Sequence, residues 1–306
     1  MHIYVIRRLL QLVPVIIGVT LVSFLMLQLI PGDPAQVLAG EAASVEQIEQ
    51  MRENLGLNEP LPHQYLSFLG NLITLDFGQS VRTDQPVIDI IAPRFWITIE
   101  LAVWSILVSM FIGLFAGIIS ATKQYSFADM GIMLVALIGL SMPNFWLGLM
   151  LMYWFSIEWG LLPTSGWGDW RQIILPAITM GTAGAAIIAR MTRSSMLEVI
   201  RQDYVRTARA KGVKERYVIY KHTLRNALIP VVTVIGLQFG YFLSGAILTE
   251  TVFSINGMGR LVVEAISARD YPVVQGTIIV LALCFVFVNF IVDIIYRLLN
   301  KRIEMN

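Results

Sequence analysis

The chain has 306 residues, of which 56% are apolar and only 14% are charged, and its mean hydropathy is +0.69. Soluble domains carry about 25% charged residues, so this composition excludes an ordinary water-soluble protein and indicates a membrane protein. The net charge of +1 gives no reason to expect nucleic-acid binding, and the single cysteine, Cys284, excludes an intramolecular disulfide.

The first apolar stretch follows Arg7 and Arg8, as it would in a secretory signal peptide. It runs from Leu9 to Ile30, which is too long for the apolar region of a signal peptide, and no small-residue cleavage site follows it. We therefore interpret it as a retained first transmembrane helix.

A helix needs about 20 apolar residues to cross the roughly 30 Å hydrocarbon core of a bilayer. The stretches that meet this length are Leu9–Ile30, Ile97–Ala121, Gly131–Ile157, Ile173–Met191, Leu228–Leu248 and Val273–Leu298. Unpaired backbone groups are costly in lipid, so the predicted fold is an all-α polytopic membrane protein with about six transmembrane helices. The fourth stretch is short and rich in Gly and Ala, which favours close helix packing over lipid contact.

The segment from Pro31 to Phe95 is too long for a simple turn between the first two spans. Ser44 and Gln47 form a capping-box pattern at the start of one helix. A second helix is expected after Pro62 and a short third one around Val87–Ile91. Two interpretations stay open: a small helical cap packed on its own membrane domain, or a docking surface for an external partner.

Basic residues are distributed unevenly between the two sides of the predicted membrane. With the N-terminus inside, the outer segments hold only Arg52, Arg82, Arg94, Arg171, Arg260 and Arg269 of the 22 Lys and Arg residues. The other basic residues fall on the inner side, so the positive-inside rule predicts that both termini lie in the cytoplasm.

The predicted cytoplasmic segment from 192 to 227 contains a short helix, capped at its start by Asp203 and closed at its end by Gly212. Before that glycine, small and basic residues alternate: Arg206, Thr207, Ala208, Arg209, Ala210 and Lys211. Small side chains let another protein approach the backbone closely, and the basic ones supply charge at the rim. From charge alone, the alternative is a juxtamembrane loop that fixes topology and contacts anionic lipid headgroups.

The order of residues in this loop resembles the coupling segment, the EAA loop, of type I ABC importer permeases. The family pattern is Glu-Ala-Ala, three residues and Gly. Here Arg206-Thr207-Ala208 replaces the opening triplet, and Gly212 stands in the matching position. The departure from Glu and the late Pro230 resemble the peptide and nickel branch, which reads RTARAKG followed by LRNAxxPVVT; this chain has RTARAKGV and LRNALIPVVT. In that branch the loop docks on an ATP-hydrolysing subunit, and the resemblance implies this role for Arg206–Gly212.

The resemblance to dipeptide, oligopeptide, glutathione and nickel permeases extends over nearly the whole chain. Further similar segments are IPGDPA (Ile30–Ala35), LGLNEPLPHQY (Leu55–Tyr65), DFGQS (Asp76–Ser80), ETVFSINGMGRL (Glu250–Leu261) and RDYPVVQG (Arg269–Gly276). The resemblance implies a first helix plus external cap over residues 1–94 and a type I transmembrane domain over residues 95–306, in the bacterial cytoplasmic membrane. It also implies three kinds of partner: a second homologous permease, two ABC ATPase subunits and an extracytoplasmic solute-binding protein. The solute stays open among peptides, glutathione-like tripeptides and nickel or its chelates.

Several enzyme and cofactor motifs are absent from the sequence. Without a GxxxxGK[ST] motif the chain does not bind ATP in the P-loop manner, so ATP-driven transport requires a separate ATPase. Neither HExxH nor GxSxG occurs, and the scattered His2, His63 and His222 do not predict a metal site or a catalytic triad. We therefore expect a permease without catalytic residues, metal or cofactor.

An ATP-independent secondary transporter or channel is the alternative from another class. Such a protein usually places ionisable residues in mid-membrane. The only acid well inside a span is Asp293, and Arg297 one turn later favours a local ion pair. Glu100 and Glu250 fall near outer span ends, where we expect water to reach them. Copurification of an ATPase distinguishes the two classes.

Four residues at membrane depth are candidates for lining the solute pathway: Pro143, Asn144, Gln238 and Asn289. Proline removes a helix hydrogen bond, so Pro143 predicts a kink in the third span. Each candidate has a plainer alternative, namely a packing kink for the proline and a hydrogen bond to a neighbouring helix for the polar side chains.

Overall fold

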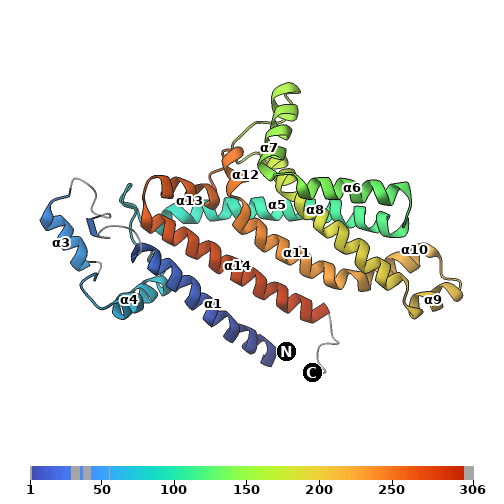
Figure 1. Ribbon diagram of the computed structural model, residues 1–306, viewed down its shortest axis with the longest axis horizontal. Helices are drawn as coiled ribbons and strands as arrows, with labels where there is room; N and C mark the ends of the chain where they lie inside the picture. Colours follow the sequence, from blue (N-terminus) through green and yellow to red (C-terminus); the bar gives the residue numbers. More distant parts are fainter. Residues whose placement is uncertain (1, 29–34, 37–42, 55, 300–306) are drawn as a thin grey trace. The chain divides into compact units, whose positions relative to one another are not determined.

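The computed structural model describes residues 2–28, 35–36, 43–54 and 56–299. Residues 30–34 of the IPGDPA segment, Leu55, and residues 300–306 lie outside the described residues. The named elements in the described part are all helices: α1 His2–Gln28, α3 Val45–Asn54, α4 Leu61–Ile73, α5 Val87–Thr122, α6 Phe127–Ser141, α7 Asn144–Met152, η1 Tyr153–Glu158, α8 Trp170–Ile200, α9 Asp203–Ala210, α10 Glu215–Tyr217, η2 Val218–Leu224, α11 Arg225–Gly245, α12 Ile247–Val252, α13 Met258–Ser267 and α14 Tyr271–Leu299 (Figure 1). The predicted all-α class is confirmed.

The described residues contain five helices long and apolar enough to cross a membrane, at Val5–Met26, Val87–Thr122, Trp170–Ile200, Glu215–Ser244 and Tyr271–Leu298. A sixth candidate is the pair Phe127–Ser141 and Asn144–Glu158, whose halves are bent by 102°. The predicted number of about six spans is thus confirmed.

The apolar stretch from Gly131 to Ile157 predicts one continuous third span, and this continuity is wrong. Helix α6 ends at Ser141, Met142 takes an extended conformation with ψ of 126°, and α7 starts after Pro143. Proline has no backbone N–H and disfavours the helical region for the residue before it, so the chain breaks rather than kinks here.

The chain divides into two compact units. Unit 1 comprises Met1–Thr98 and Asn256–Val286, and unit 2 comprises Ile99–Ile255 and Phe287–Asn306.

In unit 1, the segment between α1 and α5 contains α3 and α4, and α4 packs on α1. The capping box of α3 is confirmed, because the Gln47 N–H donates to Ser44 Oγ at 3.2 Å and the Ser44 N–H donates to Gln47 Oε1 at 2.8 Å. Helix α4 packs on α1, where the hydroxyls of Thr20 and Tyr65 lie 2.9 Å apart and the Phe24 and Tyr65 ring centroids lie 5.5 Å apart. These contacts favour the interpretation of this segment as a cap.

The predicted short helix at Val87–Ile91 is wrong as a separate element. It forms the first turns of the 36-residue helix α5, with Pro93 inside the helix. Val87 and Ile91 are buried in a core with residues of α13 and α14, such as Leu261 and Val274. This tertiary burial extends the helix beyond what the local sequence signals indicate.

In unit 2, helix α8 is the most buried of the candidate spans, with 61% of its most apolar window buried against 17% for α1. Small residues bring α5 and α8 close together: Ser109 Oγ donates to the Gly181 carbonyl at 2.8 Å, and the α-carbon of Gly117 faces Ala189 and Thr192. The expectation that the Gly- and Ala-rich fourth span packs closely is confirmed.

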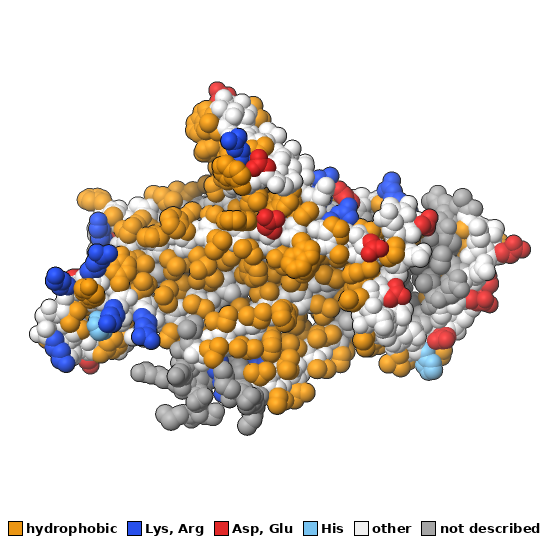
Figure 2. All heavy atoms as spheres, turned by 180° about the vertical axis from the view of Figure 1, so that it is seen from behind, with side chains coloured by type: hydrophobic (Ala, Val, Ile, Leu, Met, Phe, Trp, Pro, Cys, Tyr) orange, Lys and Arg blue, Asp and Glu red, His pale blue; other side chains and the backbone are white. Residues whose placement is uncertain are grey.

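Hydrophobic side chains cover much of the face of the molecule that Figure 2 shows. On α5 alone, Leu107, Phe111 and Phe115 are between 47% and 69% exposed. An apolar surface of this extent needs lipid or a partner protein to cover it, which agrees with a membrane location.

Candidate functional site

The predicted ATPase-coupling segment, Arg206–Gly212, lies in helix α9 and the turn that follows it. Helix α9 starts at Asp203 after a short turn, and its N-cap residue is Gln202, which makes no side-chain capping bond. The prediction that Asp203 is the cap is therefore wrong: it is the first helical residue, and its carboxylate pairs with Arg206 at 3.2 Å. An acid in this first turn still complements the helix dipole.

Helix α9 has one buried face and one open face. Val205 and Ala208 are buried in a small cluster with Val218, against which Val199 and Val213 also pack. The exposed residues of the predicted coupling segment are Arg206, Thr207, Arg209, Ala210, Lys211 and Gly212. The structure therefore brings the seven residues together on one short helix and its turn, next to α10 (Figure 1).

The turn after α9 is closed by an ion pair and a glycine. The Arg209 guanidinium binds Glu215 through two bonds, Nε to Oε2 at 3.1 Å and Nη2 to Oε1 at 2.8 Å, which raises the pKa of Arg209. Gly212 has φ of +77°, in the left-handed region, as expected of a glycine that ends a helix. Beyond its two chain neighbours, no residue has an atom within 4 Å of the position that a Cβ would take on Gly212, so this side of the glycine is open.

The chain re-enters the helical bundle through an irregular helix. After Gly212 the chain forms α10, which continues into the π-helical turns of η2 and then α11. The Thr223 hydroxyl donates to the Val218 carbonyl at 3.0 Å, and Asn226 Nδ2 donates to the Tyr204 hydroxyl at 2.7 Å. This second bond ties the start of α11 to α9.

The pathway candidates lie on three helices of unit 2. Pro143 and Asn144 are at the break before α7, Gln238 is in α11 and Asn289 is in α14. Pro143 is exposed and the other three are half-buried. Their role in lining a pathway stays a prediction.

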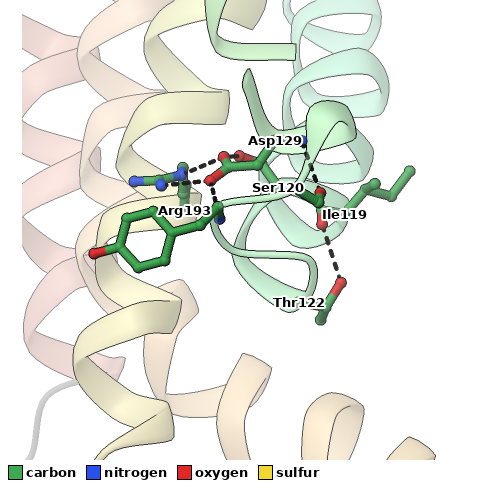
Figure 3. Close-up of polar contacts among 7 residues, drawn as sticks. Ile119, Ser120, Thr122, Asp129 and Arg193 are labelled. Atoms are coloured by element: carbon green, nitrogen blue, oxygen red, sulfur yellow. Dashed lines mark hydrogen bonds and ion pairs between the residues drawn. The ribbon is translucent and has the colours of Figure 1, made fainter. Parts of the chain in front are cut away.

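Two acidic residues of unit 2, Asp129 and Glu250, are almost fully buried. Asp129, at the start of α6, is 3% exposed and forms an ion pair with Arg193 of α8, 64 residues away (Figure 3). Sequence reasoning missed this pair. Its only signal in the sequence is that one acid and one arginine lie near the ends of predicted spans. Glu250, expected to be within reach of water, is fully buried in α12.

A groove lies in unit 1 between the DFGQS region and α13. The Ser80 hydroxyl and the Val81 N–H both donate to the Asp270 carboxylate, which holds these segments together. The groove has a volume of about 520 Å³, and its lining includes Arg82, Arg94 and Glu264. It lies between two of the predicted outer segments, the one that holds Arg82 and Arg94 and the one that holds Arg260 and Arg269.

Two family models account for most of the chain. Residues 113–305 match the model described as "Binding-protein-dependent transport system inner membrane component", and residues 1–102 match the model for the N-terminal part of such membrane components. The chain belongs to this permease family. The permease is accordingly a multi-pass membrane protein, as predicted.

Full-length relatives carry more specific names. The permease is 48% identical to the dipeptide transport system permease protein DppB of Alkalihalophilus pseudofirmus, over 98% of this chain and 99% of the relative. It is 46% identical to the glutathione transport system permease protein GsiC of Escherichia coli K12, over 98% of both chains.

Solved structures share the fold at low sequence identity. The permease matches the MetNI methionine ABC transporter in an inward-facing conformation with a TM-score of 0.60 and 19% identity, over 70% of this chain and 97% of the other. An amino acid ABC transporter crystallised with histidines matches with a TM-score of 0.52 and 12% identity, over 70% of this chain and 94% of the other. The predicted type I importer fold is confirmed.

Proposed function

We propose that this permease is one half of the membrane channel of a bacterial ABC importer for peptides. The observation that supports the solute class most directly is the identity of 48% to a dipeptide permease over the full length of both chains. A glutathione-like tripeptide is the near alternative, because the identity to a glutathione permease is 46%. Nickel or a nickel chelate is a further alternative, which rests only on shared sequence segments.

The energy source in this proposal is ATP hydrolysed on two separate ABC subunits. The exposed face of α9, with the open side of Gly212 and the basic Arg206 and Lys211, supports its role as the docking element. The buried face of α9 is anchored on α8 and η2 through Val199, Val205 and Val218. A displacement of α9 is therefore passed to the helices of unit 2, since packed interiors transmit strain.

The remaining partners complete the transport cycle. A second homologous permease supplies the other wall of the pathway. An extracytoplasmic solute-binding protein delivers the solute to the outer segments, where the charged side chains of Arg82 and Arg94 line a groove. ATP then draws the two ATPases together, and the bundle switches its opening from one side to the other. Residues 1–94 serve as the first helix and external cap, and residues 95–306 as the transport domain.

The orientation of the chain is part of the proposal, with both termini in the cytoplasm. We expect a cysteine at Glu46 in α3 to react with a membrane-impermeant maleimide added to intact cells, and a cysteine at Lys214 to react only after the membrane is opened. Both positions are exposed, and the native Cys284 is first replaced by alanine to remove background labelling. The reverse pattern contradicts the orientation.

The central test of the function is purification of the tagged permease in mild detergent, followed by mass spectrometry and an ATPase assay. We expect a second permease and a P-loop ATPase to copurify, and the complex with its binding protein to import radiolabelled dialanine or glutathione into liposomes when ATP is supplied. A permease that purifies alone and without ATPase activity favours the secondary transporter instead.

A further inference from the structure

A single carboxylate joins four segments at the α9 end of unit 2. Asp129, in the first turn of α6, accepts two bonds from Arg193 of α8, Nε to Oδ1 and Nη2 to Oδ2, both at 2.7 Å. It also accepts from the Ser120 hydroxyl of α5 and, at 3.0 Å, from the N–H of Tyr125 in the turn between α5 and α6. Figure 3 shows Asp129 directed at Arg193 from one side and Ser120 approaching from the other.

The two partners differ in burial, because the Arg193 side chain is 25% exposed. Asp129 is 3% exposed, and removing such a charge from water costs energy that the ion pair returns only when its geometry is good. Apolar replacements of buried ion pairs are often as stable or more stable. A bidentate ion pair does, however, hold α6 and α8 in one relative position, because the guanidinium and the carboxylate are both planar and their hydrogen bonds are directional.

Packed side chains connect this pair to α9. Ala121, next to Ser120, is buried together with Met196 of α8, and Val199 packs against this cluster. Val199 also packs against the cluster that holds Val205 and Ala208, the buried face of α9. The contacts are continuous from the proposed docking helix to the start of α6.

We propose that the Asp129–Arg193 pair is a positioning element that makes α6 follow the movement of α9. The proposal rests on the function proposed above, in which α9 docks on an ATPase. Helix α6 ends at the 102° break before Pro143, so a displacement of its first turn is carried to that break and to Asn144. Docking at α9 is thereby linked to a part of the predicted pathway.

The test uses the complete transporter in liposomes and measures dialanine or glutathione imported per ATP hydrolysed, together with the thermal midpoint of the complex. The decisive variant is the double substitution D129N/R193Q, which leaves no buried charge without a partner and keeps hydrogen-bonding groups at both positions. We expect its thermal midpoint and ATP hydrolysis to stay near wild type, and import per ATP to fall about fivefold, which is typical of couplings carried by such networks.

Thr122→Ala is the matched control. Thr122 lies in the last turn of α5 beside Ser120, but its hydroxyl donates only to the Ile118 and Ile119 carbonyls of its own helix (Figure 3). We expect this variant to import as much solute per ATP as wild type.

An unchanged import ratio in D129N/R193Q overturns the proposal and leaves the pair a purely structural contact. Should the double variant not assemble, S120A decides, because it keeps both charges: a loss of about twofold in import per ATP supports the proposal, and an unchanged ratio overturns it. A wild-type complex that lacks ATPase activity instead refutes the proposed function itself, so the two failures are distinguishable.

Discussion

Replacing Gly212 with valine is expected to abolish most import while the permease stays in the membrane and retains its fold. Gly212 has φ of +77° and no atom within 4 Å of the position that a Cβ would take, so the new side chain points into open space at the end of α9. The backbone strain costs about 1–2 kcal/mol locally. A clash at the centre of a docking surface costs about 2 kcal/mol or more, which is roughly a 30-fold loss of affinity.

The measurement is import and ATP hydrolysis by the reconstituted transporter, with Gly160→Val as the control. Gly160 has φ of +60° and equally open surroundings, but it follows η1, far along the chain from the coupling segment. Gly160→Val therefore has the same kind of backbone strain as Gly212→Val but lies outside the proposed docking surface. We expect near-normal import by this variant. Normal import in the Gly212 variant would remove α9 as the docking element.

Replacing Gly117 with valine is expected to disrupt the packing of α5 on α8 and with it the assembly of the transporter. A Cβ at this position would lie 2.5 Å from Thr192 Cβ and 2.7 Å from the Ala189 carbonyl oxygen. The carbonyl belongs to the backbone of the most buried span and has no rotamer by which to move aside. Overpacking of this kind costs about 1–3 kcal/mol and sometimes more.

The comparison for this variant is Gly18→Val in α1, where no atom lies within 4 Å of an added Cβ. Both substitutions place valine in an apolar helix, so helix propensity and hydrophobicity change alike. We expect the thermal midpoint of the purified permease and its yield with partner subunits to fall only for Gly117. Equal midpoints for the two variants would show that α5 and α8 do not approach each other closely at Gly117.

Much of the architecture follows from local sequence. The number of spans comes from the lengths of the apolar stretches, because backbone groups in lipid leave the helix as the available form. The capping box at Ser44 and the helix end at Gly212 are also local, since each depends on residues within one turn. The proposed coupling segment is predicted from the order of seven neighbouring residues, Arg206–Gly212.

Other features depend on residues that are distant in sequence. Val87 joins α5 because it is buried against α13 and α14, and nothing in its own neighbourhood indicates that core. Pro143 predicts a kink, but the structure has a break with a bend of 102°, whose size depends on what each half packs against. The burial of Glu250 likewise reverses an expectation based on its position near a span end.

By itself, the sequence determined the all-α class, the membrane location, the family and the segment proposed to couple to ATP hydrolysis, because these depend on composition, short periodicity and contiguous residue order. Only the tertiary structure decided which face of α9 is open, how closely α5 approaches α8, and that Asp129 meets Arg193 across 64 residues. Such pairs form when packed helices bring buried polar groups within hydrogen-bonding distance. That distance is set by the packing and does not follow from the order of residues along the chain.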